Sequence, residues 1–235
     1  MRLRRGYSSA MIHPLDRPAW SALSARQASF GLGDERARRF APDFGLFAGA
    51  ADGSAEAQAA LAALVAAYGP VATVETAVQP LPPGLAATSQ PAVLQMVAER
   101  LSPREPAFEV TALSNADAPQ MLALAVLTRP GPFFARTHQL GDFVGVKQDG
   151  ELIAMAGERM KPIGFTEVSG VCTHPDHQGK GYAAGLMAVV EAGILARGET
   201  PFLHVFAQNT GAVRLYKALG YTVRTEMNFT VLSQS

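Results

Sequence analysis

The sequence has a single cysteine and no excess charge of either sign. Cys172 is the only cysteine among 235 residues, so no disulfide can form within the chain, which favours a reducing compartment. Lys plus Arg and Asp plus Glu each number 20, and the only basic runs, residues 2–5 and 36–39, are short. Proteins that bind DNA, RNA or anionic membranes usually carry a basic face. We therefore expect a cytoplasmic protein with neither nucleic acid nor membrane as a partner.

Long hydrophobic runs are also missing. No window reaches the roughly 18 uninterrupted apolar residues of a membrane span. The alanine-rich residues 55–68 contain Glu56 and Gln58. Residues 6–20 follow the first basic run but include His, Asp, Arg and Pro, so we do not expect a secretory signal. With 48% hydrophobic residues the chain can still bury a sizeable core, as one large or two small domains.

Two closely spaced prolines, Pro103 and Pro106, mark a candidate domain boundary, because proline interrupts both helices and strand ladders. We expect a smaller α/β domain at residues 1–105 and a second domain at 106–235. In the first domain the pattern predicts helices at 19–27, 56–67 and 92–100, and strands at 44–47 and 71–77. No catalytic spacing occurs there, so this part could be a scaffold, a partner surface or a lid.

The second part has clearer patterns. Strands are predicted at 108–113, 143–146, 152–155, 165–173, 202–206 and 221–231, and helices at 117–127, 181–196 and 210–219. Asp149 and Gly150 lie between apolar runs, which indicates a two-residue hairpin loop. The strand–loop–helix–strand unit at 165–206 implies two parallel strands joined by a right-handed crossover.

The loop at residues 174–181, HPDHQGKG, ends where a helix is predicted to begin. Helix N-termini leave backbone N–H groups unpaired and carry partial positive charge, so they bind anions. Gly179 and Gly181 allow close approach of a ligand and positive φ, and Lys180 adds a cation. This composition fits a phosphate or pyrophosphate site, with a plain surface turn as the alternative.

Two standard nucleotide loops do not fit these residues. A Walker A loop would need glycine at His174 and Ser or Thr at Gly181. The G-x-G-x-x-G pattern is met only loosely by Gly179, Gly181 and Ala184, and the accompanying early strand and acidic residue are missing.

Two motifs in a fixed order carry a family resemblance. Residues 178–183, QGKGYA, match Q/R-x-x-G-x-G/A, and residues 209–221, NTGAVRLYKALGY, match N-x-x-A-x-x-L-Y-x-x-x-G-F/Y. The strand FTEVSGVCTHP at 165–175 leads into the first motif. Over about residues 108–231 the sequence thus resembles the GNAT superfamily of N-acetyltransferases, in particular its glycine N-acyltransferase-like branch. The resemblance implies an α/β fold with a mixed, mostly antiparallel sheet and a parallel strand pair at the CoA cleft. Residues 1–105 could be a degenerate half of the same fold.

The resemblance also implies a function. It predicts an acyl-CoA-dependent N-acetyltransferase that moves an acetyl or short acyl group from acetyl-CoA to a small amine or amino acid by direct attack in a ternary complex. No metal is expected, and a homodimer is left open. The alternative is a non-catalytic acyl-CoA-binding module with an interaction surface in the N-terminal half. The residues expected to bind the co-substrate are Val171, Cys172, Thr173, Gln178, Gly179, Lys180, Gly181, Tyr182, Ala183 and Asn209.

Two side chains are candidates for the proton transfers. Glu167 lies eleven residues before Gln178, where the resemblance places the glutamate that accepts the amine proton in histone-modifying members. An acid in an apolar strand beside a cleft could have a raised pKa, whereas a salt-bridged strand glutamate is the structural alternative. Glu158 and water are the other candidate bases. Tyr216 would protonate the CoA sulfur, or else simply pack its ring in the core.

Several other residues have less specific predictions. Cys172 has no evident base beside it, so a nucleophilic role is disfavoured. His174 and His177 lack further zinc ligands at recognisable spacing and are expected to be solvated. His204 faces either the acceptor cleft or the core. Arg136 closes the segment PGPFFAR, residues 130–136, which is expected at the rim of the acceptor site, where this arginine could bind a carboxylate.

Overall fold

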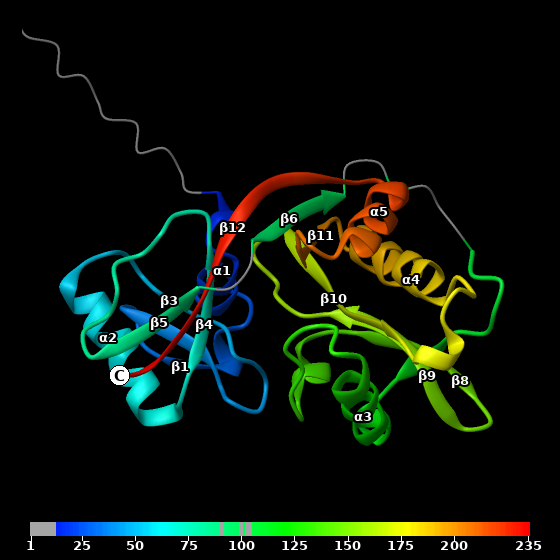
Figure 1. Cartoon of the computed structure of the whole chain (residues 1–235), viewed down its shortest axis with the longest axis horizontal. Coiled ribbons are helices and arrows are strands. Elements are labelled where there is room, and N and C mark those ends of the chain that lie inside the picture. The colour runs from blue at the N-terminus through cyan, green and yellow to red at the C-terminus, as the bar shows by residue number, and fades with distance from the viewer. Residues whose placement is uncertain (1–12, 90–91, 99–100, 102–104) are drawn as a thin grey trace, which may run out of the picture.

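The computed structural model describes residues 13–89, 92–98, 101 and 105–235. This part of the chain contains five α-helices and twelve strands, and Figure 1 shows how they are arranged. The helices are α1 (Pro18–Leu23), α2 (Ala55–Tyr68), α3 (Ala118–Thr128), α4 (Tyr182–Ala196) and α5 (Thr210–Leu219). The strands are β1 (Gly31–Gly33), β2 (Ala37–Phe40), β3 (Ala48–Ala50), β4 (Val71–Glu75), β5 (Leu85–Ser89), β6 (Val93–Ala98), β7 (Thr111–Leu113), β8 (Phe143–Gln148), β9 (Glu151–Glu158), β10 (Phe165–Thr173), β11 (Thr200–Phe206) and β12 (Tyr221–Gln234).

One large mixed sheet organises the molecule. Its strand order is β4-β12-β6-β11-β10-β9-β8-β7, and β5 pairs with β12 beside this path. Among the strands that the structure describes, β10 and β11 are the only parallel neighbours within the sheet, and their pairing joins Phe165–Glu167 to Thr200–Phe202. The predicted mixed, mostly antiparallel sheet with one parallel pair is therefore confirmed.

The last strand pairs with strands from the first part of the chain. β12 runs from the end of α5 to the C-terminus and pairs with β4, β5 and β6 (Figure 1). β6 in turn pairs with β11, beside the parallel strand. Strands from both sides of residue 105 thus share one sheet. The division into two domains at that residue stays a prediction.

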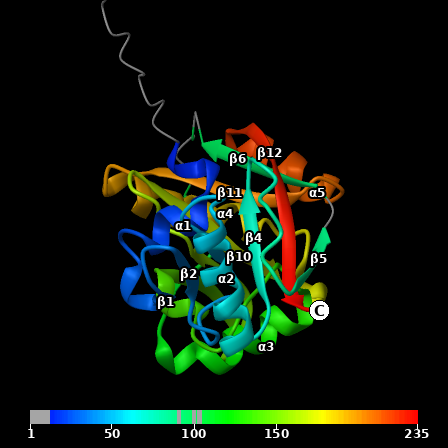
Figure 2. The ribbon, with the colours of Figure 1, turned by 90° about the vertical axis from the view of Figure 1, so that its left-hand side faces the viewer.

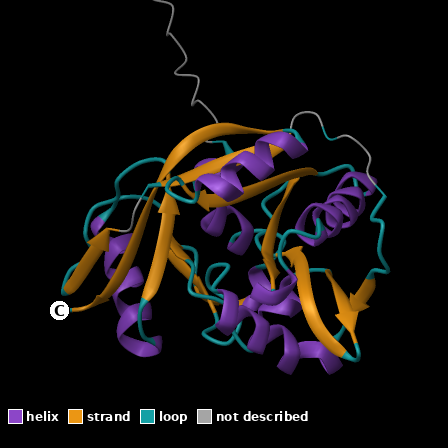
Figure 3. Ribbon diagram, turned by 45° about the vertical axis from the view of Figure 1, so that its right-hand side comes forward, coloured by secondary structure: helices purple, strands orange, loops and turns teal. Residues whose placement is uncertain are grey.

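The helices pack on the sheet through apolar side chains. Val168 and Ala156 pack with residues of α4, whereas Met155 and Cys172 pack with residues of α3, so these helices cover opposite faces of β9 and β10 (Figure 3). α2 lies alongside β4 (Figure 2), and its buried side chains form a separate cluster with residues of β2, β3, β4, β5 and β12. Among the described residues, no helix combines the length and apolar character that a membrane crossing requires.

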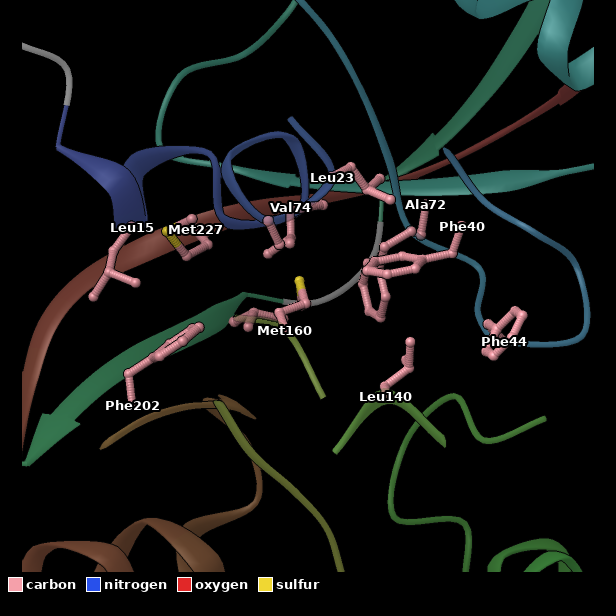
Figure 4. Packing of buried hydrophobic residues seen from close by; sticks show 14 residues of the cluster. Leu15, Leu23, Phe40, Phe44, Ala72, Val74, Leu140, Met160, Phe202 and Met227 are labelled. Carbon is pink, nitrogen blue, oxygen red and sulfur yellow. The ribbon is translucent and has the colours of Figure 1, made fainter. Parts of the chain in front are cut away.

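A continuous core joins the N-terminal residues to the rest of the chain. Figure 4 shows this cluster, in which Leu15, Phe40 and Val74 pack with Met160 and with residues of β11 and β12. The cluster brings together segments that are more than a hundred residues apart in sequence. The N-terminal third is therefore packed against the strands that form the site described below.

Most predicted elements of the second part are confirmed. β10 and α5 match their predicted bounds, and α4 begins one residue after its predicted start. The Asp149–Gly150 loop is confirmed as a two-residue hairpin, since Gln148 pairs with Glu151 and the two loop residues have φ of 52° and 85°. The predicted strand at 108–113 is shorter, because only Thr111–Leu113 pair with β8.

Four predictions for the first part are wrong or too long. The strand predicted at 71–77 ends at Glu75. The helix predicted at 92–100 is the strand β6 over Val93–Ala98, and residues 99–100 lie outside the described part. β6 is held between β11 and β12, and this pairing overrides the helical propensity of its residues. The strand predicted at 44–47 is reduced to an isolated parallel bridge between Phe47 and Ala72, and β3 begins at Ala48. The helix predicted at 19–27 ends at Leu23.

Candidate active site

A cleft opens where the two parallel strands separate. Their pairing ends after Glu167 and Phe202, beyond which β10 continues along β9 and β11 continues along β6. The cleft has a volume of about 800 Å³. It is lined by all the residues predicted to bind the co-substrate and by the two candidates for proton transfer, Glu167 and Tyr216: Val171, Cys172, Thr173, Gln178, Gly179, Lys180, Gly181, Tyr182, Ala183, Asn209, Glu167 and Tyr216.

The wall formed by β10 contains a β-bulge. The register between β10 and β9 shifts between Ser169 and Cys172, so Gly170 and Val171 have no partner on β9. Gly170 has φ of 64°, and a Cβ there would lie 3.0 Å from the Phe143 ring, which explains the glycine. A bulge frees backbone N–H and C=O groups from the ladder. Gly170 and Val171, where the ladder is interrupted, both line the cleft.

The glycine loop leads directly into helix α4. Gly179 and Gly181 have φ of 77° and 79°, and a Cβ at either position would meet no atom within 4 Å. The glycines are therefore required by backbone conformation, and the space beside them is open to a ligand. Gly181 caps α4 without any side-chain hydrogen bond. By contrast, α2 is capped by Ser54 and α5 by Asn209, each of which accepts a hydrogen bond from a backbone N–H.

The start of α4 is therefore suited to an anion. Its first N–H groups have no capping side chain, and the helix dipole adds partial positive charge. Tyr182, Ala183 and Ala184 of the first turn line the cleft, and Lys180 precedes them. A phosphate placed here would accept several backbone hydrogen bonds.

Glu167 is fully buried in an ion pair. Arg159 donates from Nε to Oε2 over 2.9 Å and from its second terminal nitrogen to Oε1 over 2.7 Å, and the Met160 N–H lies 3.3 Å from Oε2. His204 Nδ1 lies 2.8 Å from Oε1. Burial alone would raise the pKa of Glu167, but the Arg159 guanidinium and the hydrogen bonds from Arg159 and His204 outweigh it and lower the pKa to about 2. The expectation of a raised pKa at this position is therefore wrong.

His204 belongs to the same buried network and also lines the cleft. Because an ionised carboxylate only accepts hydrogen bonds, Nδ1 of His204 carries the proton that it donates to Glu167. On its other side, Nε2 lies 3.1 Å from Nε2 of Gln95. Gln95 also donates to the Leu15 carbonyl over 2.8 Å and accepts from Arg224 over 2.9 Å, so its amide is fixed. His204 therefore agrees with both alternatives that the sequence left open. Each ring nitrogen has a hydrogen-bond partner, and the side chain also lines the cleft.

Glu158, the second candidate base, does not line the cleft. It pairs opposite Val168, whose side chain packs with residues of α4, and its carboxylate is paired with Lys161 over 2.7 Å and with Arg197 over 2.5 Å. The side chain is buried in this ion pair on the helix α4 side of the sheet. Its position therefore favours a structural role.

Tyr216 reaches the cleft from α5. Its ring packs against the core that includes Leu219 and Tyr221, and its centroid lies 6.2 Å from that of Tyr221. Burial raises the pKa of Tyr216 to about 12. The phenol therefore keeps its proton at neutral pH and can act as a hydrogen-bond donor toward the cleft. Tyr216 thus packs its ring in the core, which is the structural alternative. Its side chain also lines the cleft, where the proton-donating role would require it.

Cys172 lines the cleft but has the properties of a core thiol. It is buried against residues of α3, and burial raises its pKa to about 11. A thiol with this pKa is almost entirely protonated at neutral pH, and the thiolate is the nucleophilic form. Covalent catalysis through Cys172 is therefore disfavoured on chemical grounds, in line with the sequence argument.

The structure adds cleft residues that sequence reasoning missed. Phe47 and Val74 come from the N-terminal part, and Phe206 and Phe229 from β11 and β12. The Phe229 ring lies 6.0 Å from both Phe47 and Phe206, and the Arg159 guanidinium lies 4.7 Å from the centre of the Phe47 ring. Because Arg159 also pairs with Glu167, these aromatic side chains lie at the Glu167 end of the cleft. It could not be predicted because its members meet only through strand pairing.

The rim of the cleft differs in part from its prediction. Pro130, Gly131 and Pro132 line it as predicted, together with the exposed Arg129. Arg136 does not line the cleft. It forms a salt bridge with Asp43 over 3.0 Å and lies 4.2 Å from the centre of the Phe44 ring, which points it toward the N-terminal part. The predicted carboxylate role of Arg136 is therefore wrong, and Arg129 is the cationic side chain in that place.

His177 was expected to be solvated but lines the cleft in a half-buried position. Its Nδ1 is buried without a hydrogen-bond partner among the described residues. His174 accepts a hydrogen bond from the Asp176 N–H over 3.3 Å. Within the described ranges, no three His, Cys, Asp or Glu side chains gather in a way that could hold a metal ion.

Comparisons with known proteins agree with this architecture. The sequence model of the FR47-like protein family matches residues 143–230. A protein of Novosphingobium aromaticivorans assigned to the GNAT family of acetyltransferases is 42% identical, aligning over 95% of this chain and 100% of its own, with a TM-score of 0.86. A GCN5-related N-acetyltransferase from Kribbella flavida shares the fold at 22% identity, covering 92% and 95% of the two chains, with a TM-score of 0.62. No curated protein matches the chain significantly.

The fold and the cleft define an acyltransferase. The extent and identity of the Novosphingobium match show that the chain belongs to the GNAT family. The glycine N-acyltransferase-like branch stays a prediction.

Proposed function

We propose that the protein transfers an acetyl or other short acyl group from acetyl-CoA to the amine of a small molecule or amino acid, by direct attack in a ternary complex. The observation that carries this proposal is the uncapped start of α4, preceded by two glycines in the left-handed conformation, at the open end of a splayed strand pair. Family membership supports acyl transfer, and the anion site supports a phosphate-bearing donor.

In this proposal the diphosphate of CoA binds the backbone N–H groups of residues 179–184. Gln178 and Lys180 lie beside it, and Asn209 faces it from the start of α5. The pantetheine arm follows β10, where the bulge has freed backbone groups at Gly170 and Val171. The thioester then lies between β10 and β11, toward Glu167 and Tyr216. The same geometry serves other short acyl groups.

The reaction needs few chemical groups once both substrates are held together. The amine nitrogen attacks the thioester carbon, the C–S bond breaks, the sulfur leaves as a thiolate and the nitrogen gives its proton to water. Positioning alone can remove much of the barrier to such a step. Tyr216 supplies an O–H that donates a hydrogen bond to the leaving sulfur, and with a pKa raised by burial to about 12 the phenol is protonated at neutral pH.

Glu167 enters the proposal as a positioning residue. With a pKa of about 2 and all of its oxygens paired, its carboxylate is a weak proton acceptor. It holds Arg159 and His204, which both line the cleft, in fixed orientations. The acceptor amine therefore enters in its neutral form, and its proton leaves after attack.

The acceptor end of the cleft favours a small molecule with an apolar or aromatic portion. Phe47, Phe206 and Phe229 supply ring surfaces, and such surfaces bind apolar groups. Arg129 at the rim supplies a cation that could pair with a carboxylate. An apolar amino acid combines both features, which agrees with the likeness of the motifs to glycine N-acyltransferase-like proteins.

Titration and turnover test this function separately. We expect saturable one-to-one binding of acetyl-CoA by calorimetry, followed by release of free CoA thiol when apolar amino acids and aromatic amines are added. Basic peptides should be poor acceptors. Binding without turnover on a wide amine panel would favour the non-catalytic acyl-CoA module, and failure to bind acetyl-CoA would remove the proposal itself.

Replacing Tyr216 by phenylalanine tests the proton donor. Because the change removes only the hydroxyl, we expect kcat to fall about 100-fold, the lower end of general acid catalysis, with affinity for acetyl-CoA almost unchanged. Single-turnover measurements ensure that chemistry limits the rate. Tyr68→Phe is the matched control, since that tyrosine is 47% exposed at the end of α2. An unchanged single-turnover rate in Tyr216→Phe would exclude the role.

A further inference from the structure

A second cavity lies on the reverse face of the β4–β12 strand pair. Side chains alternate along a strand, so Val74 and Phe229 line the acyl-transfer cleft while their neighbours face the other way. On that other face Thr73 pairs with Thr230, and Glu75 pairs with Asn228. All four line a cavity of about 230 Å³, which shares no lining residue with the cleft.

The face is apolar at one end and polar at the other. Val71 pairs with Leu232 at the apolar end, where both are buried under α2 with Leu61 and Val65. Beyond them the two threonines and the Glu75–Asn228 pair follow in the direction of the first turn of α2. Helix α2 thus covers the apolar end of this face, and the cavity lies at the polar end.

The helix contributes a buried amide with an unused acceptor. Gln58 is 4% exposed and lines the cavity. Its Nε2 donates to the Asp52 carbonyl over 2.9 Å, which fixes the orientation of the amide. Its Oε1 is buried and has no hydrogen-bond partner within the described residues. Leaving a buried acceptor unpaired costs free energy, so a donor is expected at this point.

The strand contributes a buried carboxylate. Glu75 is 3% exposed, and its Oε2 accepts a hydrogen bond from Arg17 Nε over 3.1 Å. Arg17 also donates to the carbonyls of Ala50 and Ala51, which holds its guanidinium outside the cavity lining. Burial raises the pKa of Glu75, and Arg17 only partly opposes this, so the carboxylate would gain from a second positive partner.

We propose that this cavity binds a small protonated primary amine that carries a short apolar chain. The ammonium group donates to Gln58 Oε1 and to the Glu75 carboxylate, with the threonine hydroxyls as further acceptors. The apolar chain packs against Leu61 and Leu232 and under the rim formed by residues 77–81. Acceptors of three kinds, an amide oxygen, a carboxylate and hydroxyls, line this one cavity, and an ammonium group with three N–H donors can pair with more than one of them.

The cavity is large enough for such a ligand. A water molecule accounts for roughly 30 Å³ of liquid volume, so the space exceeds what one bridging water needs. The site lies outside the acyl-transfer cleft, and the inference therefore goes beyond the proposed function. An amine bound there would contact the reverse side of the two strands that hold Val74 and Phe229.

Three probes of the same shape test the inference on the full chain without acyl-CoA. These are n-butylammonium, n-butanol and butyrate, with binding followed by calorimetry and by electron density in soaked crystals. We expect saturable binding of n-butylammonium with density in the cavity, and much weaker binding of the other two. Equal binding of all three probes, or n-butylammonium density only in the acyl-transfer cleft, would overturn the proposal. Neither result depends on acyl transfer, so this experiment can contradict the amine site without contradicting the proposed function.

Variants of the lining provide the second test. Gln58→Leu removes the unpaired acceptor at similar volume, and Thr73→Val removes a hydroxyl without changing shape. We expect Gln58→Leu to weaken n-butylammonium binding about 10-fold and Thr73→Val to weaken it several-fold. Thr222→Val, at the exposed far end of β12, is the control and should bind as the native protein does. Unchanged affinity in both lining variants would contradict the assigned ligand contacts.

Discussion

Replacing Gly181 by aspartate should abolish measurable acetyl-CoA binding without unfolding the protein. The new carboxylate would lie at the N-cap of α4, directly at the proposed diphosphate site. Two like charges about 5 Å apart at an effective dielectric constant of about 20 repel by roughly 3 kcal/mol, which corresponds to a loss of affinity of more than 100-fold. Asp tolerates the left-handed conformation better than most residues and is favoured at helix N-termini, so the fold should be retained.

Two further variants separate charge from size and backbone strain. Gly181→Asn has nearly the same shape without the charge, and we expect it to lose far less affinity than Gly181→Asp. Gly198→Asp adds the same charge after the other end of α4, at a glycine with φ of 73° and equally open surroundings. It should bind acetyl-CoA as the native protein does. Native-like binding by Gly181→Asp, measured by calorimetry, would remove the observation on which the proposed function depends.

The parts of the site that the sequence predicted are those formed by local structure. The glycine loop and the α4 start are contiguous, and their anion-binding character follows from helix termini and positive φ alone. The same is true of the Asp149–Gly150 hairpin and of Asn209, whose side chain accepts from the Ala212 N–H over 3.2 Å. No long-range pairing is needed to form any of them.

The missed features depend on pairing between distant segments. β6 was predicted as a helix because its local residues allow one, whereas its strand conformation comes from β11 and β12, more than a hundred residues away. Phe47 and Phe229 meet in the cleft for the same reason. Arg159 is an intermediate case. Once β9 and β10 pair so that Glu158 lies opposite Val168, Arg159 lies opposite Glu167, and the low pKa of that glutamate follows.

Replacing Glu167 by glutamine should lower the free energy of unfolding at pH 7 by about 3 to 5 kcal/mol. The change leaves Arg159 buried without its carboxylate partner, and an uncompensated buried charge is strongly destabilising. Removing Arg159 as well, in the double variant with Arg159→Met, should recover much of the loss, because neither charge then remains buried alone. Urea unfolding of the two single variants and the double variant measures this coupling. Strictly additive effects would contradict the ion-pair argument.

The stabilising effect of Glu167 should disappear in acid. Its folded-state pKa of about 2 is below the ordinary value of 4.5, so its ionised form stabilises the fold fully above about pH 4.5. That stability is lost as the pH falls toward 2, and the difference between native protein and Glu167→Gln should shrink over this range. Asp34 and Asp117, whose pKa values are also lowered to about 2 by hydrogen bonds from Arg36 and Lys147, titrate in both proteins and cancel in the comparison.

The same variant decides the catalytic role of the carboxylate. If Glu167 only positions its neighbours, kcat/KM of Glu167→Gln falls at every pH. The midpoint of its pH profile then stays where ionisation of the acceptor amine sets it. If instead the carboxylate accepts the amine proton, the variant should require a higher pH for activity than the native enzyme. We expect the first result, because all of its oxygens are occupied by Arg159, His204 and the Met160 N–H. A midpoint shifted to higher pH would restore Glu167 as the base, and a conformational change would then be needed to release it from Arg159.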